Sequence, residues 1–75
     1  MTYYYVTWDE KKNNHYYEFI HVIPGNNIPH VRSILNAEQS YRRQTGRPHM
    51  FHIRITKSRP DEDEIERRER GHLYF

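Results

Sequence analysis

The fold of this chain is decided near its start, by Tyr3–Tyr4–Tyr5–Val6–Thr7–Trp8. These residues are aromatic or β-branched and include no Gly or Pro, so the stretch predicts a central β-strand. Side chains alternate along a strand, which places Tyr4, Val6 and Trp8 on one face. That face is the more apolar of the two, and we expect it to form part of the core.

A second strand is predicted after a tight turn. The polar run 9–14 ends in Asn13 and Asn14, and asparagine tolerates the positive φ that hairpin turns require. The chain from His15 to Ile23 is again rich in strand-forming residues, so an antiparallel hairpin follows. Both faces of this second strand are largely apolar, and the sequence leaves open which one meets the core. The alternatives are Tyr17, Phe19, His21 and Ile23, or Tyr16, Glu18, Ile20 and Val22.

Residues 27–46 predict one amphipathic helix. Asn26 or Asn27 suits the N-cap, Pro29 suits the first turn, and Gly46 suits the C-terminal end. Glu38 interrupts the apolar stripe of this helix, which consists of Val31, Ile34, Leu35 and Tyr41.

A third strand is predicted over His49–Lys57, where apolar and polar residues alternate. We expect Phe51, Ile53 and Ile55 to face inward, and Met50, His52, Arg54 and Thr56 to face outward. A hairpin, a helix and a returning strand predict a small α+β domain of ββαβ type. Its three-stranded antiparallel sheet, in the order 2-1-3, packs on one helix. The second sheet face then lacks a cover, unless the end of the chain folds back or another molecule binds there.

The charge pattern divides the chain into a body, residues 1–60, and a charged tail, residues 61–75. The body carries nine Lys or Arg against four Asp or Glu, a net of +5; the tail carries three against six, a net of −3. In the segment Asp61–Gly71 the acids come first and the arginines come late, which favours a helix because this order complements the helix dipole. The tail ends in the apolar and aromatic Leu73–Tyr74–Phe75.

Composition excludes several classes of protein. A chain of 75 residues forms one domain without a deep cleft, and the absence of Cys excludes disulfides and thiolate metal sites. No apolar run approaches a membrane span and no signal peptide is recognisable, so we expect a cytoplasmic protein without a membrane partner. His49 and His52 lie three residues apart on a strand and therefore point to opposite faces, which argues against a shared metal ion. With no phosphate-binding loop and no nucleophile motif either, we expect no cofactor and no enzymatic activity.

Two surfaces are candidates for binding. On the open sheet face, Tyr3, Tyr5, His52 and Arg54 would form an aromatic and basic patch suited to a protein partner. The basic end of the helix, with Arg42, Arg43 and Arg47 reinforced by Arg32, would suit nucleic acid, as would stacking on the same sheet face. Self-association through the uncovered face, giving a homodimer, is a further alternative.

In the order of its elements, its size and its aromatic hairpin, the stretch from Tyr3 to Pro60 resembles small ββαβ proteins with which phages inhibit host machinery. One such group is the T7-type inhibitors of bacterial RNA polymerase, and the nearest local likeness is Phe51–Arg59 followed by Pro60. The helix here is Arg-rich where theirs is acidic, and the charged tail is additional, so no functional residue is carried over. The resemblance implies a non-catalytic regulator or inhibitor that binds a host protein, and a nucleic-acid-binding module is the alternative.

Overall fold

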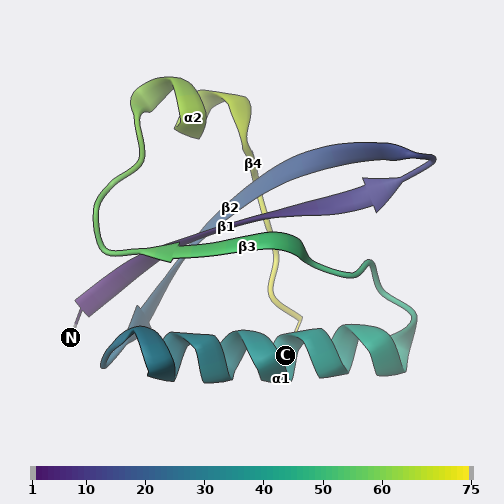
Figure 1. Cartoon of the computed structure of the whole chain (residues 1–75), viewed down its shortest axis with the longest axis horizontal. Helices are drawn as coiled ribbons and strands as arrows, with labels where there is room; N and C mark the ends of the chain where they lie inside the picture. The colour runs from purple at the N-terminus through teal and green to yellow at the C-terminus, as the bar shows by residue number, and fades with distance from the viewer. Residues whose placement is uncertain (1, 75) are drawn as a thin grey trace.

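The computed structural model describes residues 2–74 as one mixed sheet with a helix on each side (Figure 1). In chain order the elements are β1 (Thr2–Lys12), β2 (His15–Gly25), α1 (Ile28–Thr45), β3 (Phe51–Thr56), α2 (Glu62–Arg67) and β4 (Glu69–Arg70). The strand order is β3-β1-β2-β4, in which β1 pairs antiparallel with both neighbours and β4 pairs parallel with β2. The α+β class is confirmed. The predicted order 2-1-3 and the antiparallel pairing hold for β1, β2 and β3, but the sheet has four strands and is mixed, because β4 adds to β2 in the parallel direction.

Local sequence signals account for the hairpin and the long helix. Asn13 and Asn14 form the two-residue turn with φ of 53° and 65°, the left-handed conformation that such turns require. Asn27 caps α1 by accepting a hydrogen bond at 2.8 Å from the backbone N–H of His30. Gly46 ends the helix with φ of 71° and donates its N–H to the carbonyl of Arg42.

The core lies between α1 and the sheet face that was expected to be buried. Its buried apolar residues come from β1, β2, α1 and the segment before β3; they are Tyr4, Val6, Trp8, Ile23, Val31, Leu35 and Met50. In the β1–β2 register, Trp8 lies opposite Phe19 and Tyr4 opposite Ile23. Directly opposed residues share a face, so the strand face that begins at Tyr17 is the one turned towards α1.

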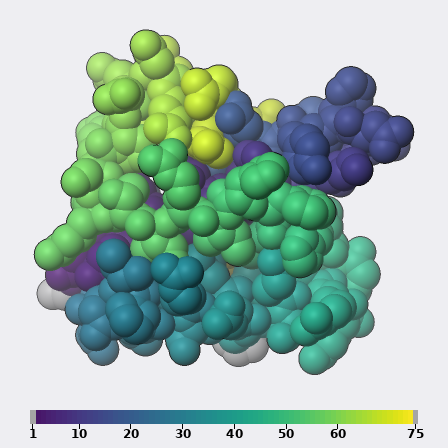
Figure 2. Space-filling view, viewed as in Figure 1, coloured from purple at the N-terminus to yellow at the C-terminus, as the bar shows by residue number. Residues whose placement is uncertain are grey.

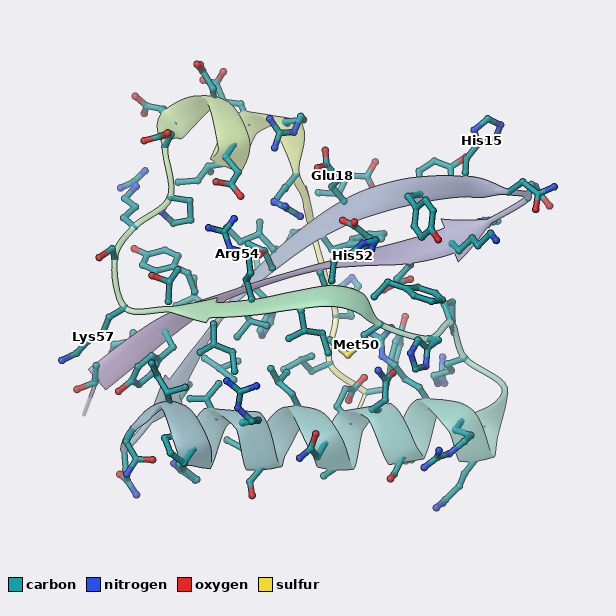
Figure 3. All side chains as sticks on the ribbon, in the orientation of Figure 1. His15, Glu18, Met50, His52, Arg54 and Lys57 are labelled. Carbon is teal, nitrogen blue, oxygen red and sulfur yellow. The ribbon has the colours of Figure 1, made fainter. Side chains whose placement is uncertain are left out.

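The predicted facing of the third strand is partly wrong. Met50, expected to point outward, is 2% exposed and lies between the sheet and α1, whereas Ile53, expected to point inward, is 37% exposed (Figure 3). The cause is a β-bulge: Thr7 pairs with Arg54 and Asp9 with Phe51, so β3 holds one extra residue. The extra residue reverses the alternation before His52 and turns Phe51 out of the core. Ile53 remains exposed because β3 is an edge strand.

The chain after β3 crosses the second face of the sheet. Residues 57–70, here called the crossing segment, leave the β3 edge, form α2 above the sheet and reach the opposite edge as β4 (Figure 1). The helix expected over Asp61–Gly71 is limited to six residues, Glu62–Arg67. Of the alternatives left open for the second face, the structure shows the end of the chain folding back over part of it.

Beyond β4 the chain passes to the α1 side of the sheet. The Gly71 N–H donates to the carbonyl of Ile20 at 2.9 Å, and a Cβ added at Gly71 would lie 2.3 Å from the ring of Trp8. Only glycine fits between β2 and this buried indole. Leu73 then packs against the core, while Phe75 lies outside the described residues.

A buried charge cluster holds this last stretch against the body. Arg42 has no exposed surface and donates to Glu38 at 2.6 Å, to Glu10 at 3.0 Å and to the carbonyls of Pro48 and His72 at 3.0 and 2.7 Å. Glu38, also fully buried, accepts from the backbone N–H of Tyr74 at 2.8 Å. The Arg42 cluster, consisting of Arg42, Glu38 and Glu10, therefore joins the hairpin, α1, the α1–β3 loop and the C-terminal stretch.

Candidate binding surfaces

The β1–β2 hairpin projects beyond the rest of the molecule and carries an exposed group of aromatic and basic side chains (Figure 2). The ring of Tyr16 contacts Phe51 edge-on at 5.7 Å and His52 at 5.5 Å between centroids. His49 also contacts Phe51, at 4.7 Å, and the Lys11 ammonium lies 5.8 Å from the Tyr16 ring centroid. We call Lys11, Tyr16, His49, Phe51 and His52 the hairpin-end cluster.

The backbone at His52 fixes this cluster in place. His52 has φ of 54°, which is uncommon for a residue with a Cβ and costs about 1–3 kcal/mol. Its Nδ1 lies 2.8 Å from the Asp9 carboxylate, although the imidazole itself is two-thirds exposed. The bulge and this contact set the imidazole beside Tyr16. The surface is thus ordered before any partner arrives, which lowers the entropic cost of binding.

The other side of the hairpin lines a hollow of about 650 Å³. Its walls come from the hairpin, from the α1–β3 loop and from β4; they include Lys11, Lys12, Tyr17, Phe19, Pro48 and Glu69. Arg47, next to Pro48, stacks on the ring of Tyr74 at 4.0 Å. Exposed cations and tyrosines therefore also gather at this end of the molecule.

Of the four residues predicted for a protein partner, Tyr3, Tyr5 and Arg54 share the second face of the sheet, while His52 lies apart from the two tyrosines. Tyr3 is 61% exposed and Tyr5 is half-buried near the start of β1, whereas His52 lies beside Asp9 near the other end. Arg54 points away from α1 on the second face and lies 4.0 Å from Glu64 of α2 (Figure 3). Only His52 belongs to the hairpin-end cluster.

The arginines predicted for nucleic acid are separated in a similar way. Arg42 is enclosed by the Arg42 cluster and is not available to a phosphate in this fold. Arg32, Arg43 and Arg47 are exposed, with Arg32 in the first half of α1 and the other two at its C-terminal end. The basic surface at the helix end is therefore smaller than the sequence indicates.

Sequence reasoning missed Tyr16, Phe51 and His49 as surface residues. The position of Tyr16 depended on which face of β2 meets the core, and the sequence left that open. Phe51 was expected in the core because the alternation was taken as regular, and no glycine in this stretch indicates the bulge. One feature of the sequence indicates that Tyr16 is exposed. It lies two residues after the Asn13–Asn14 turn, at the end of a hairpin that is long enough to extend past the covering helix.

Within residues 2–74 no group of three or more acidic or His side chains is arranged to hold a metal ion. In the same range no helix is long and apolar enough to cross a membrane. Comparison with protein-family models, with curated proteins and with solved structures finds no match to this chain.

Proposed function

We propose that this protein is a small non-catalytic binding module that recognises a protein partner through the hairpin-end cluster. The proposal extends the expectation of a regulator or inhibitor, since a module of this kind acts by occupying its partner's surface. The observation that supports it best is the exposure of Tyr16, 50% of which faces solvent while its ring rests against Phe51 and His52.

Physical chemistry favours a protein interface at this place. Tyrosine offers a large apolar ring and a polar hydroxyl while immobilising few rotatable bonds, and it is enriched where interfaces concentrate their binding energy. Ring contacts with Phe51 and His52 already restrict Tyr16 in the free protein. The projecting hairpin also leaves Lys11 and Tyr16 accessible to a partner (Figure 2).

Nucleic-acid binding is the second candidate, and one observation favours it. Four cations are exposed on the hairpin and near the C-terminal end of α1: Lys11, Lys12, Arg43 and Arg47. Two of them lie over aromatic rings, Lys11 over Tyr16 and Arg47 over Tyr74. Cations combined with stacking rings are suited to single strands. The burial of Arg42 removes one of the predicted phosphate contacts, so we rank this function second.

The proposed function is tested by affinity capture with tagged protein from a lysate of the organism that carries the gene, with and without nuclease. We expect one protein at fixed stoichiometry that survives nuclease, and at least about tenfold weaker binding of that purified protein by Tyr16→Ala. Tyr17→Ala is the matched control because Tyr17 is its neighbour in β2, similarly exposed on the opposite face. Both variants must retain the wild-type circular dichroism spectrum.

Two results would contradict this proposal. Equal binding by the wild type and Tyr16→Ala would remove the hairpin-end cluster as the site. Recovery that disappears with nuclease, together with binding that weakens steeply as salt rises, would replace the protein partner with nucleic acid.

A further inference from the structure

A second hollow, of about 310 Å³, lies on the opposite side of the sheet from α1, between β1, β2 and the crossing segment. Its lining is mainly apolar, with Tyr5, Ile20 and Val22 from the strands and Ile65 from α2. Ile65 is the one apolar residue of α2, so this short helix covers the face by a single side chain and leaves space beside it.

Two arginines, Arg59 and Arg70, also line this hollow. Both are exposed, and neither has an Asp or Glu oxygen within 4.0 Å among residues 2–74. Two neighbouring arginines differ, since Arg67 pairs with Glu18 and Arg68 pairs with three acids. Arg59 and Arg70 therefore offer positive charge next to an apolar space, whereas Arg67 and Arg68 are paired with acids.

The apolar surface continues past the hollow along the strands. Tyr5 lies opposite Val22 and Tyr3 opposite Pro24, so these four residues share the second face. Tyr3, Val22 and Pro24 are exposed, Val22 to 45%. These residues form an apolar strip that starts in the hollow and continues along the second face of β1 and β2. The strip is longer than the hollow, which suits an extended ligand.

We propose that the hollow and this strip bind an acidic peptide segment of a protein partner. One apolar side chain of the peptide enters the space between Tyr5 and Ile65, and its neighbouring carboxylates bind Arg59 and Arg70. Charge complementarity favours this occupant, because guanidinium groups form their strongest hydrogen bonds with carboxylates and phosphates. The mainly apolar lining, which holds two arginines among residues 2–74, favours a peptide over nucleic acid, because nucleic acid needs several phosphate contacts.

Among residues 2–74, no Asp or Glu side chain lines this hollow. Glu64 lines a separate polar hollow with Thr7 and Arg54, and it is already paired with Arg68 at 3.2 Å. Arg59 lies between the two hollows and lines both. The inference rests on protein recognition as the class of function, but it uses no residue of the hairpin-end cluster.

The test is an NMR titration of the full ¹⁵N-labelled chain with the synthetic peptide acetyl-DLEVD-amide. We expect the largest shift changes at the amides of Tyr5, Val22, Arg59 and Arg70. The neutral peptide acetyl-NLQVN-amide is the control and should bind at least about tenfold more weakly, because it lacks the charge-assisted hydrogen bonds. Arg59→Gln with Arg70→Gln should weaken the acidic peptide to the same extent, while Arg67→Gln leaves its dissociation constant unchanged.

Several outcomes would overturn the inference. These are an absence of shifts at millimolar acidic peptide, shifts centred on the hairpin-end cluster, equal binding of the neutral peptide, and tighter binding of an oligothymidylate. Shifts at Tyr5 and Val22 that depend on protein concentration without peptide would show that a second copy of the chain occupies the strip. A failed titration leaves the Tyr16→Ala result untouched, so the two proposals fail separately.

Discussion

Arg42 is the residue on which the body and the end of the chain both depend. Four of its hydrogen bonds reach α1, the hairpin, the α1–β3 loop and the C-terminal stretch. A buried guanidinium is tolerated only when its charge and its donors are matched. Here Glu38 and Glu10 match the charge, and the rings of Trp8 and Tyr74 lie 5.7 and 5.2 Å from the guanidinium carbon.

We expect Arg42→Met to lower the free energy of unfolding by about 3–5 kcal/mol, because it removes the guanidinium that pairs with the buried Glu38 and with Glu10. That is most of the stability of a domain this small. Urea unfolding followed by the fluorescence of Trp8, the single tryptophan, measures the loss.

The double variant Arg42→Met with Glu38→Leu is the informative control. Replacing both members of the buried pair by apolar side chains costs less than removing one of them, so part of the lost stability should return. A single variant as stable as the wild type would show that the Arg42 cluster contributes little.

Residue types alone could not place Arg42 correctly. Arginines near a helix C-terminus are expected on the surface, where they complement the dipole, and Arg43 does lie there. The i,i+4 spacing of Glu38 and Arg42 indicates a pair but not its burial. Burial follows from Glu10, Pro48 and His72, which approach from distant parts of the chain.

At the scale of elements, the crossing segment is held more by one arginine than by its own helix. Six residues are too few for a stable helix in isolation. Arg68, whose side chain is 10% exposed, pairs with Glu64 at 3.2 Å and with Asp9 at 3.6 Å, and it donates to the carbonyl of Trp8 at 3.5 Å. It thereby ties α2 to β1 across the second face of the sheet.

Replacing Arg68 by Met should release the crossing segment while the hairpin stays folded. The amide protons of Ile65, Arg68 and Gly71 bond to Asp61, Glu64 and Ile20. Their exchange rates, measured by NMR, should rise at least about tenfold as local opening becomes easier. Arg67→Met is the matched control, since Arg67 makes one exposed ion pair, and it should leave these rates nearly unchanged. If these amide protons exchange equally slowly in Arg68→Met and in the wild type, the crossing segment is held by Gly71 and Leu73 and not by Arg68.

Elements with local signals could be predicted and those without them could not. Asn13–Asn14, Asn27 and Gly46 fix their own conformations, so the hairpin and α1 follow from nearby residues. Nothing in Glu69–Arg70 resembles a strand, because β4 exists only through its pairing with β2 far away in the sequence. The hairpin-end cluster could not be predicted either, because it depends on the alignment of β3 with β1, which are far apart in the sequence.

The whole molecule is flat, with extents of 35 × 29 × 15 Å and a radius of gyration of 12.2 Å. A compact chain of this length has a radius of about 11 Å, and the projecting hairpin accounts for the difference (Figure 2). The first turn of α2 carries the acids Glu62, Asp63 and Glu64, whereas the hairpin carries Lys11 and Lys12. The part of the molecule that holds α2 and the end that holds the hairpin therefore differ in charge, while both candidate surfaces carry cations, Lys11 in one and Arg59 and Arg70 in the other.

The crossing segment begins with two exposed residues, Lys57 and Ser58, and the chain is held by the sheet both before and after them. Lys57 and Ser58 are exposed, yet the residues after them are held by β2, by Arg42 and by the core contact of Leu73. A protease site inserted after Lys57 and then cleaved should therefore leave both pieces bound to each other. We expect them to elute together in size-exclusion chromatography and to separate only in urea; separation in native buffer would contradict this.

After a cut at that point, the attachment of the C-terminal piece to the body is a binding reaction between two molecules and no longer part of the folding of one chain. The shorter piece would then have to find the longer one by diffusion, and its attachment would depend on concentration, which it does not in the intact chain. The intact protein would in that sense be a tethered complex, with residues 69–74 as a built-in ligand of the body. Variants of the shorter piece could then be compared by ordinary binding measurements, as one compares inhibitors of a receptor.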